Sequence, residues 1–315
     1  MTMEPITLSQ NVNNLIDEFN AIGPNEEESF PNASIVIFHL DTTDWNVKIA
    51  EICQIAAWCK EKTFNECLLP TYISPVSTNE NGFEIDENGR LLHYNEVVNA
   101  VSPKDGLENF LNFLSVLTGN TRTVLLAANN CNSFHRHVIV RLMKKYNLFD
   151  EFKSLVLGFI DTIPVFKSTL PDRKEKFGLE ELANDFLDEN INSQQKHAVV
   201  YVKMLVSLIE AINCNDTMMK RHVEELDSFI LFLDLKKDFK NELKDDLLRK
   251  IAKAGFTTNM LKDAYRADPN DGVTRLLKGG DGKPGLKLQK ATFKKIIDEV
   301  SKMCANNENV GNDTA

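Results

Sequence analysis

The chain has 315 residues, of which 43% are apolar, and a net charge of −10 at pH 7. This length and apolar content suffice for one large folded core and a smaller second one. Its six cysteines form no CxxC pair and show no metal-ligand spacing, and no apolar run is long enough to span a membrane. These features exclude a disulfide scaffold and an integral membrane protein. We expect a reduced, soluble protein of the cytoplasm without a secretory leader.

The negative charge is unevenly distributed along the chain. Residues 227–304 contain 17 Lys and Arg against 12 Asp and Glu, whereas residues 1–226 contain 19 against 32. A polyanionic partner is therefore expected to contact mainly the basic C-terminal part. Ordinary helical domains carry a similar excess, so charge only supports this interpretation.

The first half of the chain predicts a mobile segment and then an antiparallel meander. Residues 1–30 contain Gly, Pro and an acidic run with one short apolar patch, which is typical of a mobile segment. The apolar, β-branched run 35–43 predicts a buried central strand, and residues 49–60 and 63–69 predict two more strands. Residues 71–103, rich in Asn, Gly, Pro and Ser, predict a long loop over a site.

Strands and helices then alternate, which predicts a parallel half of the same sheet. The expected elements are helix 107–117, strand 123–128, helix 133–146, strand 155–162, a helix beginning near 177 and helix 193–212. With the meander, they predict a fold of the α/β class, in which a mixed five-stranded sheet is flanked by helices. This domain is expected to occupy residues 31–226.

Only helices are predicted in the basic C-terminal part. Short helices joined by Gly-containing turns predict a small all-α bundle over residues 227–304. The Asn- and Asp-rich residues 305–315 predict a disordered tail. The expected helices are 229–254, 257–265, 273–277 and 288–303.

The central strand ends in two polar side chains that alternation places on the same side, His39 and Asp41. The segment Phe38-His39-Leu40-Asp41-Thr42-Thr43 resembles the first motif of the DnaQ-like (DEDD) 3′→5′ exonucleases, Phe-Asp-x-Glu-Thr-Thr. In that family the two carboxylates hold catalytic metal ions. Here His39 stands at the position of the Asp, and Asp41 at the position of the Glu.

The resemblance extends to the later exonuclease motifs, in the same order. The segment Leu125–His135 is similar to the second motif, with His135 at the position of its Asp. Residues 158–163 resemble the strand-ending Asp-Thr-Leu segment, in which Asp161 is expected to cap a helix or turn. Residues 196–202 resemble the third motif, where a His general base precedes the last Asp by five residues. His197 is retained, and Val202 replaces that Asp.

These replacements predict a protein without hydrolytic activity and without a metal cofactor. Two-metal phosphodiester hydrolysis needs several carboxylates around the metal ions, and Asp41 alone remains of the four in the family. Val202 cannot coordinate a metal, and imidazoles are poor ligands for magnesium. Two interpretations of the residual cluster stay open: a metal-free polar cluster, or capture of one transition metal by His39, Asp41, His135 and His197.

An exonuclease-like domain with a degenerate site, followed by a helical bundle, is similar to the Exuperantia family of insect maternal-mRNA localisation proteins. The segments that carry this resemblance are 41–43, 54–57, 110–114, 144–148 and 254–256. The resemblance implies an RNase H-like exonuclease fold joined to a SAM-like (sterile-alpha-motif-like) bundle. It also implies a homodimer formed through the first domain, and binding of structured mRNA 3′ untranslated regions together with other ribonucleoprotein components, away from membranes.

Lysines at helical spacing suggest where RNA is bound. Lys236, Lys240 and Lys244 follow each other at intervals of four, and a second group shares a face of the last expected helix. A solvated helix face explains the same pattern equally well. Two other functions remain open, an exonuclease with a rearranged site and a protein-interaction scaffold. The candidate RNA-binding residues are Lys236, Lys240, Lys244, Arg249, Lys250, Lys253, Lys287, Lys290 and Lys294.

Overall fold

The computed structural model describes residues 30–119, 122–187, 197–240, 242–279 and 282–310. The segment expected to be mobile lies outside the described residues up to position 29, and so do the last five residues of the expected tail. Residues Ala33–Ala315 form one compact unit. All six cysteines are free thiols. Among the described residues, no helix combines the length and apolar character needed to cross a membrane.

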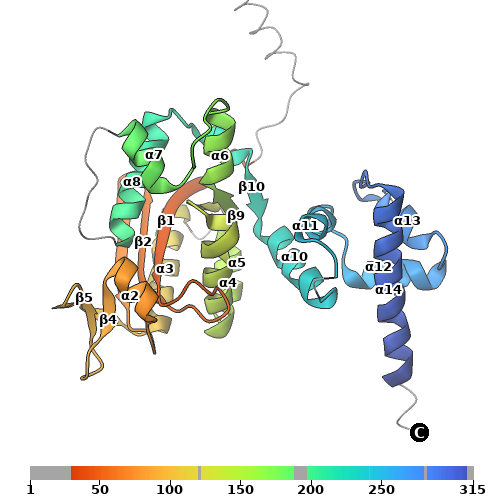
Figure 1. Ribbon diagram of the computed structural model, residues 1–315, viewed down its shortest axis with the longest axis horizontal. Coiled ribbons are helices and arrows are strands. Elements are labelled where there is room, and N and C mark those ends of the chain that lie inside the picture. The colour runs from red at the N-terminus through yellow and green to blue at the C-terminus, as the bar shows by residue number, and fades with distance from the viewer. Residues whose placement is uncertain (1–29, 120–121, 188–196, 241, 280–281, 311–315) are drawn as a thin grey trace, which may run out of the picture. The chain divides into compact units, whose positions relative to one another are not determined.

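A mixed sheet forms the centre of this unit, with seven strands in the order β10-β9-β8-β1-β2-β3-β7 (Figure 1). Strand β1 pairs antiparallel with β2 and parallel with β8. The five expected strands are present, and the short strands β7 and β10 extend its two edges. The strand bounds are Ser34–Thr42 (β1), Ile52–Cys59 (β2), Lys62–Leu68 (β3), Ala100–Val101 (β7), Val124–Ala128 (β8), Val156–Asp161 (β9) and Val223–Glu225 (β10).

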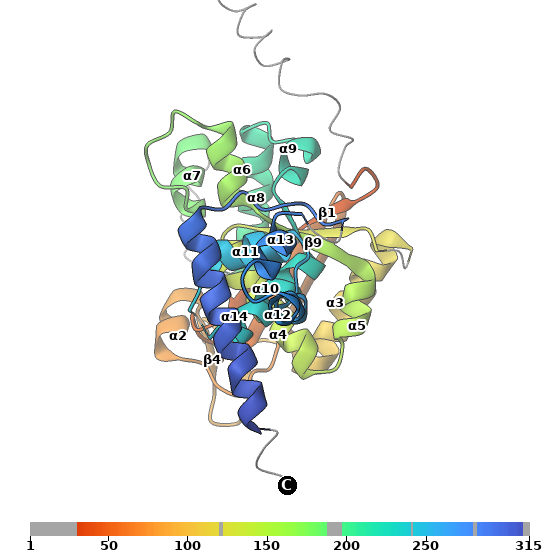
Figure 2. The same ribbon diagram turned by 90° about the vertical axis from the view of Figure 1, so that its right-hand side faces the viewer.

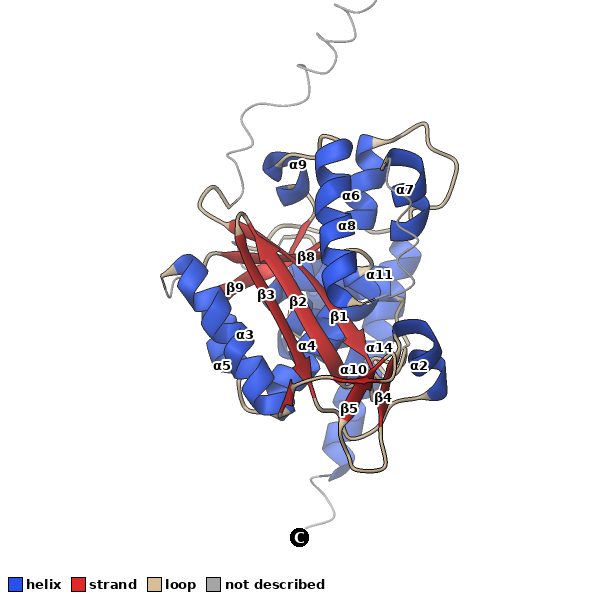
Figure 3. Cartoon of the chain, turned by 90° about the vertical axis from the view of Figure 1, so that its left-hand side faces the viewer, coloured by secondary structure: helices blue, strands red, loops and turns tan. Residues whose placement is uncertain are grey.

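Strand β1 is central because both of its faces are covered. Val36 and Phe38 point into the main hydrophobic core, and Ile37 on the opposite face is also buried. A strand with both faces buried has a continuous run of apolar residues, and this run allowed the sequence to predict β1. Helix α8 (Ala198–Ala211) packs on β1 and β2 from one side (Figure 3). The other side is covered by α3 (Pro103–Thr118), α4 (Arg136–Lys145) and α5 (Phe149–Leu155) (Figure 1).

The long loop predicted over residues 71–103 is wrong, because this segment contains a helix and a small three-stranded sheet. Helix α2 (Pro75–Asn81) begins after the N-cap Ser74 and ends at Gly82, which has a φ of 73°. The strands that follow bury Phe83 and Leu91 against Cys53 of β2. Their bounds are Phe83–Ile85 (β4), Leu91–His93 (β5) and Glu96–Val97 (β6).

Strand β8 leads into α4 through one turn of π-helix, η1 (Cys131–His135). Asp161, at the end of β9, connects the turn η1 to the start of the helix that follows β9. Its Oδ2 accepts a hydrogen bond from the N–H of Asn132 (2.9 Å), and its Oδ1 accepts one from Ile163 (3.0 Å) at the start of α6 (Thr162–Thr169). The predicted capping role is therefore confirmed. Helices α5, α6 and α9 (Asp216–Lys220) were not predicted, and α7 (Leu179–Phe186) corresponds to the helix expected near 177.

The C-terminal part contains five helices among the described residues, with α14 packed against α12 and α13 (Figure 2). Helix α14 includes residues 305–310, so the predicted tail is wrong over those positions. The SAM-like assignment of this part stays a prediction. The bounds are Leu226–Asp238 (α10), Asp245–Lys253 (α11), Thr258–Ala267 (α12), Gly272–Leu277 (α13) and Lys290–Val310 (α14).

The single helix predicted over residues 229–254 is wrong, because the chain breaks between α10 and α11. Lys240 adopts a left-handed conformation with a φ of 47°. The charges favour the break: Lys236 and Lys237 lie in the last turn of α10, where cations are stabilised. Two aspartates occupy the first turn of α11, where anions are stabilised.

The prediction that two groups of lysines each lie along one face of a helix is also wrong. Lys240 lies in the break, and Lys244 is the residue that precedes the first turn of α11. Lys287 lies before α14, which begins at Lys290. The candidate lysines therefore sit around helix ends and do not form two continuous lines.

Strand β10 attaches the C-terminal helices to the sheet. It pairs antiparallel with β9, and a Cβ atom at Gly158 would lie only 2.6 Å from the backbone oxygen of Glu224. Only glycine permits this close approach. Beside it, Arg136 of α4 is fully buried and pairs with Glu224 (Nη1–Oε2 2.6 Å), which also pairs with Arg249 of α11 (3.0 Å). The core continues from the sheet into α10 through Phe229.

Candidate functional site

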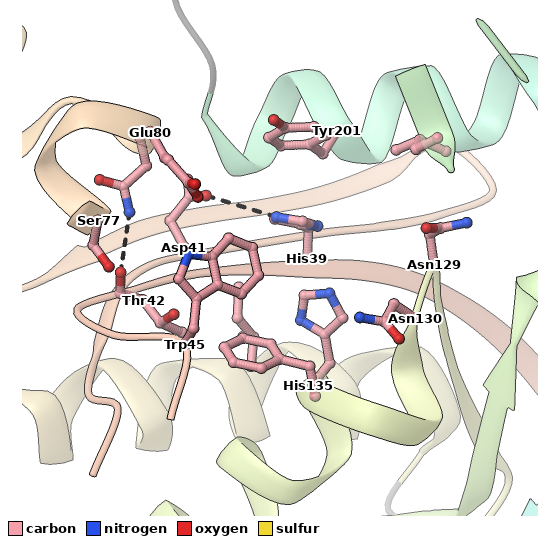
Figure 4. A pocket seen from close by; sticks show the side chains of 14 residues that line it. His39, Asp41, Thr42, Trp45, Ser77, Glu80, Asn129, Asn130, His135 and Tyr201 are labelled. Carbon is pink, nitrogen blue, oxygen red and sulfur yellow. Dashed lines mark hydrogen bonds and ion pairs between the residues drawn. The ribbon is translucent and has the colours of Figure 1, made fainter. Parts of the chain in front are cut away.

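A pocket of about 220 Å³ lies at the carboxyl end of β1 (Figure 4). Its walls come from β1 and the loop after it, α2, the turn η1 and α8. These elements are distant in sequence and meet here because β1 is central to the sheet. His39 and Asp41 both line the pocket, as the strand alternation predicted.

His39 is held among polar and aromatic neighbours. Its Nε2 lies 3.6 Å from Oδ1 of Asp41. Its ring stacks on Tyr201 of α8, with a centroid distance of 4.6 Å and an interplanar angle of 22°. The ring of His135 meets it edge-on at 4.7 Å. The position that carries the first metal-binding Asp in the exonucleases therefore carries a packed imidazole.

Asp41 is engaged with the protein through both carboxylate oxygens. Oδ2 accepts a hydrogen bond of 2.6 Å from the backbone N–H of Ala198, the first residue of α8, and Oδ1 faces His39. Gln54 of β2 also accepts from this N–H at 3.0 Å. Asp41 is buried and lies at the positive end of the helix dipole. Its carboxylate therefore joins β1 to the start of α8.

His135 is a neutral, buried imidazole with one unused nitrogen. Burial lowers its pKa well below the ordinary value, and His39 lowers it further. A hydrogen bond with the Asn129 backbone opposes this shift. The Nδ1 atom has no hydrogen-bond partner. Nδ1 is therefore a buried ring nitrogen whose hydrogen-bonding capacity is unused.

His197 and Val202 do not line the pocket. His197 precedes α8, its ring lies edge-on to His93 at 5.7 Å, and burial lowers its pKa. Val202 is 4% exposed, so its side chain is packed inside the protein. The residue at the position of the last family Asp is therefore part of the core.

The site does not fit the metal ions that the exonuclease fold implies. Within the described residues, no group of three or more His, Cys, Asp or Glu side chains is placed to hold a metal ion. The four residues considered for a transition metal are not gathered into one ligand set. Asp41 binds a backbone N–H, and the nearest histidines contact each other and Tyr201.

Sequence reasoning missed the aromatic and acidic walls of the pocket. Tyr201 lies about one turn after His197 at the start of α8. This spacing was the one sequence signal that could have placed Tyr201 near the site. Trp45 is 59% exposed in the loop after β1, with its ring 5.5 Å from that of Phe134. Glu80 comes from α2, inside the segment predicted to be a loop.

Two of the candidate RNA-binding residues are engaged elsewhere. The Nζ atom of Lys236 pairs with Oδ2 of Asp245 at 2.6 Å. The guanidinium of Arg249 pairs with Glu224 and lies 4.1 Å from the ring centroid of Phe232. The other candidates are exposed: Lys240, Lys244, Lys250, Lys253, Lys287, Lys290 and Lys294.

Comparisons with known proteins agree with this fold. Residues 33–187 match the family described as the Exuperantia RNAse H-like domain. Maternal protein exuperantia-1 of Drosophila pseudoobscura pseudoobscura is 24% identical over 181 residues, which are 54% of this chain and 36% of that protein. Maternal protein exuperantia of Drosophila virilis is 24% identical over 159 residues, 47% of this chain and 32% of that protein. The chain thus spans about a third of the length of these curated relatives.

The chain is also similar in fold to exonuclease I of E. coli, in a crystal structure with a dA16 oligonucleotide. The TM-score is 0.46 and the sequence identity is 10%. The match covers 65% of this chain and 45% of that one.

Proposed function

Because the chain is an Exuperantia-like protein with an exonuclease-like domain, we propose that it is a non-catalytic RNA-binding protein. It acts in the localisation of maternal mRNA within a cytoplasmic ribonucleoprotein. The exonuclease-like domain serves as a scaffold and forms a homodimer, and RNA is bound jointly by this domain and the SAM-like helices.

The non-catalytic part of this proposal rests mainly on Asp41. In two-metal hydrolysis a carboxylate at this position must be free to neutralise dications. Here one oxygen accepts from Ala198 and the other faces His39. The positions of two further family carboxylates carry His135, which is neutral, and Val202, which is packed. A phosphodiester in this pocket would find no counter-charge.

The RNA-binding part rests on the exposed lysines of the C-terminal helices. Lys250 and Lys253 lie in the last turn of α11, and Lys290 and Lys294 lie at the start of α14. All four are exposed, and none of them forms an ion pair among the described residues. Such lysines attract phosphates and release counterions when RNA binds.

The test is a titration of the purified chain with a structured RNA and with a single-stranded RNA at two salt concentrations. The variant carries Lys240→Glu, Lys250→Glu and Lys253→Glu. We expect weaker binding and a smaller salt dependence. The slope of log K against the logarithm of the salt concentration should become less steep by about 0.7–0.9 for each phosphate that the variant no longer neutralises. A matched control changes three exposed lysines of the exonuclease-like domain: Lys62→Glu, Lys104→Glu and Lys203→Glu.

The control has the same net charge as the variant, so it measures the general effect of added negative charge. If the variant retains the parent's affinity and salt slope, the C-terminal helices do not bind RNA. Absence of salt-sensitive RNA binding by the parent would favour the protein-interaction scaffold. Light scattering on the same samples tests the homodimer.

The enzymatic alternative is tested with 5′-labelled RNA incubated with Mg²⁺ or Mn²⁺. We expect the RNA to keep its full length. Shortened products from the unmodified chain would overturn the non-catalytic function and leave RNA binding as a property of an active nuclease.

A further inference from the structure

The pocket at the end of β1 contains acidic side chains and no lysine or arginine of the described residues. Its lining contains the carboxylates of Asp41 and Glu80. The pKa of His135 is too low for it to contribute a positive charge near neutral pH. Such a pocket repels a phosphate in the absence of metal ions and attracts a cation.

The walls are suited to an organic cation with a flat charged group. The ring of His39 stacks on that of Tyr201 (Figure 4). The ring of Trp45 lies next to that of Phe134, another pocket-lining residue. Aromatic faces attract ammonium and guanidinium groups, and guanidinium also stacks on them. Trp45 is 59% exposed, so its ring is available to a ligand.

A buried polar atom in the pocket lacks a hydrogen-bond partner. His135 is 4% exposed and lines the pocket, and its Nδ1 has no hydrogen-bond partner. A buried ring nitrogen without a partner is costly. In the tautomer that carries its proton on Nε2, Nδ1 accepts a hydrogen bond, and a ligand N–H would satisfy it. Guanidinium provides five N–H donors in one plane, whereas a phosphodiester provides none.

The size of the pocket and its surroundings indicate a polypeptide ligand. Drug-sized ligands occupy about 300–1,000 Å³, so a pocket of about 220 Å³ holds a single side chain. Val76 precedes the pocket-lining Ser77 in the chain, and its side chain is 57% exposed. The backbone N–H of Ser74 donates to the carbonyl of Thr43 at 2.9 Å, which joins the start of α2 to the loop that carries Trp45. This apolar rim offers contacts to residues on either side of an inserted side chain.

We infer that this pocket binds an arginine side chain of a partner protein. The guanidinium is held by Glu80, the aromatic walls and Nδ1 of His135, and neighbouring partner residues contact Trp45 and Val76. This function is separate from RNA binding and uses none of the lysines assigned to it. The site whose residues do not fit catalytic metal ions thus becomes a contact point within a protein assembly.

The test uses three short peptides of one sequence, acetyl-Leu-Gly-X-Gly-Leu-amide, in which X is arginine, citrulline or lysine. Citrulline has nearly the shape of arginine but no charge. Binding to the full chain is followed by tryptophan fluorescence and by calorimetry. We expect the arginine peptide to bind with a Kd on the order of 1 mM or below. The citrulline and lysine peptides should bind on the order of fivefold more weakly or worse.

Two exposed substitutions test the site without disturbing the core. Glu80→Gln and Trp45→Ala should each weaken the arginine peptide by on the order of fivefold. Glu87→Gln, an exposed charge change in the β4–β5 turn, is the control and should leave binding unchanged. None of the three should alter the affinity for RNA. The failure of this inference is therefore distinguishable from failure of the proposed function.

Three outcomes would overturn the inference. Equal binding of the arginine and citrulline peptides would show that the charge is not recognised. Equal binding of the peptide and of free arginine amide would show that the rim contacts no polypeptide. Displacement of the arginine peptide by uridine monophosphate at similar concentrations would assign the pocket to a nucleotide.

Discussion

The backbone N–H of Ala198 donates a hydrogen bond of 2.6 Å to Oδ2 of Asp41, and this contact joins residues 157 positions apart in the chain. The first N–H groups of a helix have no partner within the helix, and a carboxylate there satisfies one of them. The acidic side chain retained from the first exonuclease motif therefore stabilises the start of α8.

Replacing Asp41 by Ala should lower the free energy of unfolding by about 1–2 kcal/mol, the range found when helix caps are removed. Gln54 still accepts from the same N–H in this variant, which limits the effect. Asp41→Asn keeps an oxygen acceptor and should cost less. Urea unfolding of the three proteins provides the comparison. Equal stability of the Ala variant and the parent would contradict a capping role.

His39→Asp should not produce magnesium-dependent cleavage. The substitution restores one carboxylate, but Asp41 still binds Ala198, and positions 135 and 202 still lack acidic groups. A two-metal centre needs more negative charge than this. The assay is 5′-labelled RNA with Mg²⁺, with an active DEDD exonuclease as the positive control. Cleavage by this single variant would mean that the other positions are dispensable.

Val202→Asp should destabilise the fold by about 3–5 kcal/mol, because it buries a charge without a partner. Val202 is 4% exposed on the face of α8 that packs on the sheet. Ser207→Asp places the same charge on the exposed face of the same helix and should change stability by less than about 0.5 kcal/mol. Thermal and urea unfolding give both values, and similar stability of the two variants would be inconsistent with a packed Val202.

Glu224→Gln should lower the unfolding free energy by about 3 kcal/mol. It removes the negative charge that pairs with Arg136, whose side chain is fully buried and whose Nη2 already lacks a hydrogen bond. Breaking a buried pair costs about 3–5 kcal/mol, and the lower value applies because Glu224 is itself 25% exposed. Glu225→Gln, at the exposed next position, is the control. A cost below that of the control would exclude the Arg136 pair as a stabilising contact.

Stability should decrease as the pH falls below about 6.5, partly through His137. Burial, with Arg136 and two further cations nearby, lowers the pKa of His137 to about 4. Between these two values the unfolded chain binds a proton at this residue and the folded chain does not. This histidine therefore removes about 1.4 kcal/mol of stability per pH unit as the pH falls through that window.

His137→Gln should reduce the change in unfolding free energy between about pH 6.5 and pH 4. The substitution should change the unfolding free energy less at pH 8 than the removal of this proton linkage changes it at pH 4. The measurement is urea unfolding of the parent and variant at several pH values. The same pH slope in both proteins would mean that His137 is already charged in the folded state.

The sequence predicted those features that repeat locally. The run around Ile37 identified the central strand, and its period of two placed His39 and Asp41 on one side. The break after Asp238 was missed because the apolar spacing of Leu235, Phe239 and Leu243 continues across it, although the charges reverse there as they do at helix ends.

The pocket could be predicted only in part. Its strand residues follow from alternation, but Trp45, Glu80 and Tyr201 reach it from separate elements. Their convergence depends on how α2 and α8 pack on the sheet, and no local pattern records this. The capping of Ala198 by Asp41 was missed for the same reason.

The missing side chain of Gly158 has a consequence for how this chain tolerates change. Strand β10 fits against β9 because no Cβ separates Gly158 from Glu224, and the C-terminal helices follow directly from β10. One added carbon atom at this position would push β10 away and separate Glu224 from Arg136. A replacement as mild as Gly158→Ala would thus weaken one attachment of the C-terminal helices to the sheet and leave the core contact through Phe229 in place.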